Sequence, residues 1–144
     1  MFTLRNNHIA ISLTVDAPIE QVWDQLTSWE KQSEWMLQTH VWIESGITQG
    51  VGTKISAFTG LRRLGVLDTM EVTLWEPPNI CDVIHTGKII KGTGRFQLRE
   101  LSPTVTAFDW SEEVWALRIV FIFIKPAIYL GVRISLARFA RTFH

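Results

Sequence analysis

Residues 8–35 read HIAISLTVDAPIEQVWDQLTSWEKQSEW, and this stretch joins a strand pattern to a helix pattern. Its first eight residues alternate apolar and polar side chains and are rich in β-branched residues, which is typical of a half-buried strand. Pro18 follows at a position suited to the first turn of a helix, where a missing N–H costs nothing. Apolar residues then recur at helical spacing as Ile19, Val22, Trp23 and Leu26. Ser28 can cap a second, short helix that ends near Trp35.

Six strand-like segments follow these two helices. Short stretches rich in Gly, Pro, Asn and Ser separate them, as expected for antiparallel hairpins. The segments are 38–44, 51–59, 66–76, 80–86, 89–101 and 104–115.

The C-terminal stretch returns to helical periodicity. One face would carry Ile128, Val132, Leu136, Phe139 and Phe143, and the other Gly131, Ser135, Arg138 and Thr142. Residues 117–125 fit a helix, a strand or a loop, and Pro126 should kink or restart a helix. The order of elements predicts an α+β fold, in which a seven-stranded antiparallel sheet wraps around the long C-terminal helix and two short helices follow the first strand.

Composition favours one compact domain that spans residues 1–144, because 47% of the side chains are apolar and 19% are charged. The net charge is zero, so no overall field favours nucleic acid as a partner. The charges are nevertheless distributed unevenly along the chain. Residues 116–144 carry five basic and no acidic side chains, which leaves nine basic and fourteen acidic side chains before them.

Cysteine content and hydropathy bear on the compartment. Cys81 is the only cysteine, which excludes an internal disulfide and fits a reducing cytoplasm. The N-terminus lacks the continuous apolar stretch of a signal peptide. Residues 116–132 are interrupted by Arg118, Lys125 and Pro126 and fall short of the roughly twenty apolar residues of a membrane span. We therefore expect a cytoplasmic protein in which this stretch is buried or interfacial.

Several longer motifs occur in a fixed order along the chain. They are VDAPIEQVWDQLTSWEKQSEWM at 15–36, the turn at 50–52, MEVTLWEPP at 70–78, HTGKIIKGTGRF at 85–96, FDWSEEV at 108–114 and SLARFAR at 135–141. Together they resemble the polyketide cyclase/dehydrase and lipid-transport family, within the START-like (SRPBCC) superfamily of helix-grip folds. The resemblance covers nearly the whole chain and implies an apolar cavity between the sheet and the C-terminal helix. It implies no single reaction, because members include carriers and aromatase/cyclases, and no shared catalytic signature carries over.

Period-two alternation on the strands and the helical stripe suggest which side chains would enclose that cavity. The alternative is that the same residues fill a solid core. The candidates are Trp42, Phe58, Met70, Val72, Phe96, Phe108, Trp110, Ile128, Val132, Leu136 and Phe139.

Three polar residues are candidates for binding or acid–base chemistry. Glu112 shares a strand face with Phe108 and Trp110, where it could donate a proton or anchor a ligand, or reach solvent at the rim of the cavity. His85 precedes a Gly turn and could act as a general base, or simply face solvent at the end of a hairpin. Asp68 shares the face of Met70, or only satisfies backbone donors.

Other kinds of site have little support. The four histidines, His8, His40, His85 and His144, show no metal-ligand spacing, so we expect neither a metal nor a cofactor. The glycine-rich run at 92–96 lies inside a strand pattern and lacks the helix start of a phosphate loop.

Three hypotheses about function follow. The first is that the protein binds or carries a small hydrophobic molecule, such as a lipid, an isoprenoid or an aromatic metabolite. The second is an aromatase-like cyclase or dehydratase that uses Glu112 or His85 as acid or base. The third is peripheral contact with a membrane or a partner chain through the basic, apolar segment 117–141. The sequence leaves the ligand and the oligomeric state open.

Overall fold

A computed structural model describes residues 4–61, 64–87 and 90–143, with side-chain surroundings for 8–60, 65–87, 90–114 and 130–143. The elements are β1 (Leu4–Val15), α1 (Ile19–Thr27), the 3₁₀ turn η1 (Trp29–Lys31), α2 (Gln32–Trp35), β2 (Thr39–Ile43), β3 (Lys54–Leu61), β4 (Leu64–Glu76), β5 (Ile80–Thr86), β6 (Lys91–Ser102), β7 (Val105–Leu117) and α3 (Arg118–Arg141).

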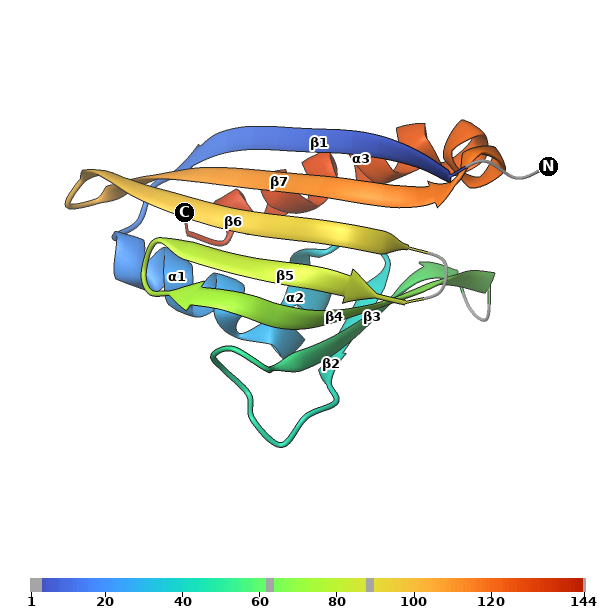
Figure 1. Ribbon diagram of the computed structural model, residues 1–144. Helices are drawn as coiled ribbons and strands as arrows, with labels where there is room; N and C mark the ends of the chain where they lie inside the picture. Colours follow the sequence, from blue (N-terminus) through green and yellow to red (C-terminus); the bar gives the residue numbers. More distant parts are fainter. Residues whose placement is uncertain (1–3, 62–63, 88–89, 144) are drawn as a thin grey trace.

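The strands form one antiparallel sheet in the order β1-β7-β6-β5-β4-β3-β2. Figure 1 shows that α3 runs behind β1 and β7 and that α1 and α2 lie behind the other half of the sheet. The helices therefore share one face of the sheet. This confirms the predicted seven-stranded helix-grip fold with two short helices after the first strand.

Helix α1 forms where the sequence predicts it. Pro18 directly precedes its first residue, and the stripe Ile19, Val22, Trp23 and Leu26 is buried. Trp23 packs edge-on against Trp75 of β4, with ring centroids 5.1 Å apart. This contact holds α1 against the C-terminal end of β4, which ends at Glu76.

A β-bulge in β4 changes the predicted alternation. The strand register shifts between Val72 and Leu74, which leaves Thr73 as an extra residue. Alternation without a bulge puts Leu74 on the inner face, but Trp75 packs against the core there instead.

The C-terminal helix resolves the open assignment of residues 117–125. Strand β7 ends at Leu117 and α3 begins at Arg118. Leu136 and Phe139 are buried as the stripe predicts. The prediction that Ser135 lies on the opposite, polar face is wrong, because Ser135 is 1% exposed. Its hydroxyl accepts a hydrogen bond from the Leu37 N–H at 2.8 Å, which ties α3 to the segment after α2.

Candidate functional site

A cavity of about 500 Å³ lies between the sheet and the helices. Most of its wall is apolar. The wall comprises Ile9, Trp29, Gln32, Met36, Leu37, Gln38, Thr39, Val41, Ala57, Thr59, Val66, Asp68, Met70, Val83, His85, Ile90, Gly94, Phe96, Trp110, Glu112, Val114, Leu130, Gly131, Val132, Ile134 and Ser135.

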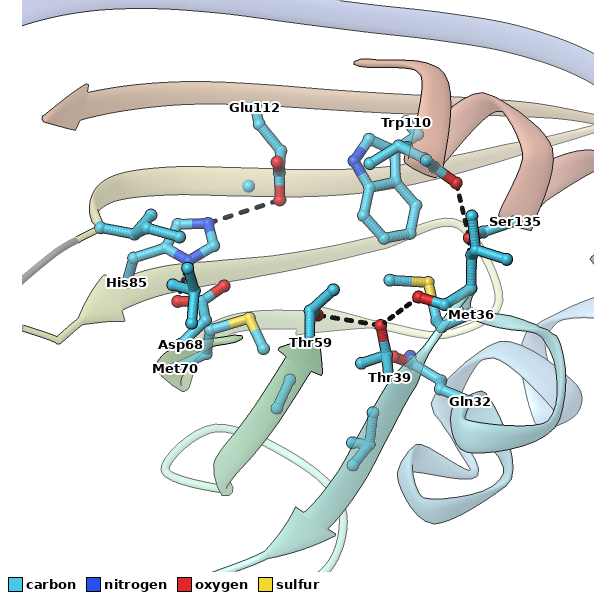
Figure 2. A pocket seen from close by; sticks show the side chains of 18 of the residues that line it. Gln32, Met36, Thr39, Thr59, Asp68, Met70, His85, Trp110, Glu112 and Ser135 are labelled. Atoms are coloured by element: carbon cyan, nitrogen blue, oxygen red, sulfur yellow. Dashed lines mark hydrogen bonds and ion pairs between the residues drawn. The ribbon is translucent and has the colours of Figure 1, made fainter. Parts of the chain in front are cut away.

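One end of the cavity carries a charged cluster, which we define as Asp68, His85 and Glu112. The three side chains point toward one another in Figure 2, with Glu112 above the imidazole and Asp68 below it. Nδ1 of His85 lies 2.8 Å from Oδ1 of Asp68, and Nε2 lies 3.4 Å from Oε1 of Glu112. The His85 side chain is 2% exposed, against 21% for Asp68 and 14% for Glu112.

Strand register brings the charged cluster together. His85 of β5 pairs with Met70 of β4, two residues from Asp68 on the same face. Glu112 of β7 pairs with Gly94 of β6, the strand between it and β5. A Cβ at Gly94 would lie 3.4 Å from Oε1 of Glu112, so the missing side chain leaves room for the carboxylate to extend over β6 toward His85.

The environment of His85 favours the protonated ring. Burial alone lowers its pKa, but the hydrogen bond with Asp68 and the attraction of the Asp68 and Glu112 carboxylates outweigh burial and raise the pKa from 6.5 to about 10. At neutral pH the ring is therefore an imidazolium, and Nδ1–H donates to Asp68. Nε2 has no partner with hydrogen-bond geometry, so its 3.4 Å approach to Glu112 is an ion-pair contact.

Uncharged polar groups lie on the opposite side of the cavity, where Figure 2 shows Gln32, Thr39 and Ser135. They are already engaged with the chain. The Thr39 hydroxyl donates to the Leu37 carbonyl at 2.9 Å, the Ser135 hydroxyl donates to the Gly131 carbonyl at 2.7 Å, and the Gln32 amide donates to the Leu26 carbonyl at 3.0 Å. These bonds fix the wall rather than offer free groups to a ligand.

Two tryptophans differ from this pattern. The indole N–H groups of Trp29 and Trp110 are buried and have no hydrogen-bond partner. Both residues line the cavity. Because buried donors are nearly always bonded, these two N–H groups are exceptions among the described residues.

The structure brings part of the predicted set to the cavity wall. Asp68, His85 and Glu112 line it together, so a solvent-facing His85 and an Asp68 that serves only backbone donors are not observed. Four of the predicted apolar residues also line it. They are Met70, Phe96, Trp110 and Val132.

Four other predicted lining residues belong to the filled core, as the alternative interpretation holds. They are Val72, Phe108, Leu136 and Phe139, each at most 1% exposed. Phe108 and Phe139 pack edge to face, with centroids 5.8 Å apart. Their size closes the space that a cavity would need.

Trp42 and Phe58 require a correction, because they lie on the other face of β2 and β3. Trp42 stacks on His40, with ring centroids 5.5 Å apart. The adjacent residue Val41, which points to the opposite face of β2, lines the cavity. Ala57 and Thr59, on either side of Phe58, likewise line it. Ile128 has a side chain outside the described residues.

Sequence reasoning missed the contributions of the short helices and of small residues. Trp29, Gln32 and Met36 come from η1, α2 and the residue after α2, and Gly131 and Ser135 come from α3. The motif at 15–36 contains the first three, but helical spacing in so short a segment does not identify a face. Small residues give no hydrophobic signal at all.

Two further features bear on other kinds of site. The described residues include no group of His, Cys, Asp or Glu side chains arranged to hold a metal ion. Along the part of the chain that the structure describes, no helix is both long enough and apolar enough to cross a bilayer. Arg133 and Arg141 are exposed, but the side chains of 117–129 lie outside the described residues, so membrane or partner contact through 117–141 stays a prediction.

Solved structures share this curled sheet closed by a C-terminal helix. The Zhui aromatase/cyclase from Streptomyces sp. R1128 is similar at a TM-score of 0.80, with 14% identity over 96% of this chain and 93% of that chain. A norcoclaurine synthase point mutant from Thalictrum flavum, in complex with a transition-state analogue, gives 0.71, with 14% identity over 98% and 96%. A START superfamily protein from Mycobacterium smegmatis gives 0.70, with 13% identity over 93% and 92%.

These identities are low, and the likeness establishes the fold alone. No protein-family model matches the sequence, and no curated protein matches it. Function has to be argued from the cavity itself.

Proposed function

We propose that the protein binds a small, largely apolar molecule in the cavity between the sheet and α3. The observation that carries this proposal is the open volume of about 500 Å³ between the sheet and the helices. Small-molecule sites typically occupy about 300–1,000 Å³. The wall is mostly apolar, so burial of ligand surface would contribute about 25 cal/mol for each Å² removed from water.

The unpartnered donors in the wall support a ligand with at least one polar group. Trp29 Nε1, Trp110 Nε1 and His85 Nε2 are buried without hydrogen-bond partners. Leaving such groups unbonded costs about 1–3 kcal/mol each. A ligand that satisfies one of them gains orientation as well as affinity.

Two residues of α3 support access from solvent. Leu130 is 57% exposed and Ile134 is 36% exposed, and both line the cavity. Large apolar side chains that belong to a cavity wall and still contact water are expected at its mouth. We place the entrance beside this turn of α3.

The test is titration with N-phenyl-1-naphthylamine, a neutral apolar dye whose fluorescence rises in apolar surroundings. Gly131 lines the cavity, and a Cβ there would meet nothing within 4 Å, so Gly131→Leu puts a side chain into open space. We expect saturable binding to the wild type and at least about tenfold weaker binding to Gly131→Leu, which corresponds to 1.4 kcal/mol or more.

The matched control is Gly46→Leu, since Gly46 lies in the exposed loop after β2 and its Cβ would also meet nothing within 4 Å. This variant should bind the dye as the wild type does. Equal binding by the two leucine variants, or no saturable binding to the wild type by any apolar probe, would contradict the proposal.

The charged cluster favours a second candidate function, an aromatase-like cyclase or dehydratase. An imidazolium between two carboxylates beside an apolar chamber can hold and transfer a proton while the chamber orients a reactive chain. Turnover of a poly-β-ketone substrate should then fall by about 10²-fold or more in His85→Ala and Glu112→Gln. Unchanged turnover in both variants would remove this candidate.

A further inference from the structure

The charges around the cavity are unequal in number and confined to one end. Among the described lining residues, Asp68, His85 and Glu112 are the only ones with ionisable side chains. The cluster therefore has two carboxyl groups for a single imidazole, and no Lys or Arg of the described residues joins it in the wall.

The two carboxylates are engaged to different degrees. Asp68 accepts a hydrogen bond from Nδ1 of His85 at 2.8 Å, so these two side chains form a tight, mutually neutralising pair. Glu112 lies 3.4 Å from Nε2, which is longer than an ordinary N–H···O hydrogen bond. Nε2 is left without a hydrogen-bond partner although the ring is 2% exposed. Glu112 therefore keeps acceptor capacity that His85 does not use.

An apolar ligand would change the surroundings of Glu112. Its side chain is 14% exposed, so water still reaches it when the cavity is empty of a ligand. A ligand that fills the cavity displaces this water, and a carboxylate deprived of water is strongly destabilised unless a cation or donor replaces it. A ligand carboxylate or phosphate at the same end would add repulsion.

We propose that the cavity takes an apolar molecule that carries a protonated amine, and that this amine pairs with Glu112. The inference rests on the proposed binding function and narrows it to one class of ligand. It excludes fatty acids and phosphate-bearing lipids as preferred ligands. The cluster has one imidazolium for two carboxylates, so the amine would supply the second positive charge. The apolar part of the ligand would fill the chamber beside Trp110.

The experiment compares three molecules of similar shape by isothermal titration calorimetry at pH 7. They are 2-(1-naphthyl)ethylamine, 2-(1-naphthyl)ethanol and 1-naphthylacetate, which present a cation, a neutral hydroxyl and an anion on the same ring system. We expect the amine to bind about tenfold or more tightly than the alcohol, and the carboxylate to bind more weakly than the alcohol. The preference should shrink as salt is raised.

Glu112→Gln should bring the affinity for the amine down to that for the alcohol and leave the alcohol nearly unchanged. The matched control is Glu113→Gln, because the neighbouring carboxylate is 54% exposed and lies 3.9 Å from His8, away from the charged cluster. This variant should keep the full preference for the amine.

Several outcomes would contradict the pairing of an amine with Glu112. A carboxylate that binds as tightly as the amine, or a preference that survives in Glu112→Gln, overturns the amine pairing while the binding function stands. Failure of all three compounds to bind overturns both. If Glu112→Gln does not fold, as judged by thermal unfolding, the ratio of amine to carboxylate affinity in the wild type still decides between cation and anion.

Discussion

The space between the sheet and α3 has a filled half and a hollow half, and the same helix contributes to both. In the filled half, Phe139 contacts Trp35 and Phe108, with ring centroids 4.8 and 5.8 Å away. In the hollow half, Gly131 and Ser135 of the same helix line the cavity. Small residues on the helix thus leave the volume that aromatic residues close one turn later. The size of the side chain, more than its polarity, decides where a ligand could fit.

The largest expected effect comes from emptying the filled half. Phe139→Ala removes a side chain that is 1% exposed, and we expect it to lower the free energy of unfolding by about 3–5 kcal/mol. Urea denaturation measures this loss. Because Phe139 does not border the cavity, affinity for N-phenyl-1-naphthylamine should change by less than about threefold. A small loss of stability with a large loss of binding would reverse the roles given to the two halves.

The second effect is the dependence of stability on pH in the hollow half. The pKa of His85 is raised to about 10 in the folded protein, against 6.5 for an ordinary imidazole. Below about pH 6.5 both folded and unfolded states hold the proton, and the full stabilisation is present. As pH rises from 6.5 to 10, only the folded state holds the proton, so stability falls.

Thermal unfolding between pH 6.5 and 10 measures this dependence. The wild-type midpoint should fall by on the order of 5 °C or more across the window. His85→Gln should lose most of this slope, whereas His40→Gln, at an exposed position on the outer face of β2, should keep it. Equal slopes in the two variants would show that the buried imidazole does not carry the effect.

The smallest effect has the opposite sign. Gly131 lies within α3, and a Cβ there would meet nothing within 4 Å. Gly131→Ala should therefore raise the free energy of unfolding by about 0.5–1 kcal/mol, because alanine loses less conformational entropy in a helix. Urea denaturation checks this, and dye binding should weaken less than in Gly131→Leu. Destabilisation would mean that the space at this position is not open.

The fold could be predicted because its signals are local. The alternation at 8–15, the helical stripe from Ile19 to Leu26 and the turn residues between strands each act over a few neighbours, and the resulting elements match the structure closely. The segment 117–125 could not be assigned, because β-branched residues fit either state there. Its backbone is helical from Arg118.

The candidate site was harder, because it depends on register and on which face of each strand points inward. Alternation selects Asp68 and Glu112, and the position before a Gly turn selects His85. Their convergence depends on Gly94 beside Glu112 and Met70 beside His85. A shift of one residue in the assignment moves every side chain of a strand to the opposite face of the sheet.

Trp42 and Thr73 illustrate two reasons why the inward face of a strand is predicted incorrectly. The sequence predicts that Trp42 lines the cavity, yet its indole N–H donates to Glu44 on the outer side. Thr73 is an extra residue that exchanges the faces of Leu74 and Trp75. Alternation alone gives neither which face of a strand points inward nor where a bulge occurs.

The most direct test of a ligand-binding hollow half is to follow the tryptophan indole N–H signals by ¹H–¹⁵N NMR during titration with N-phenyl-1-naphthylamine. The indole signals of Trp29 and Trp110 should shift strongly, because a dye inside the cavity would lie against the side chains that line it. Trp42, which faces the other side of β2, should not move. A titration that shifts Trp42 and leaves Trp29 and Trp110 unchanged would contradict binding in this cavity.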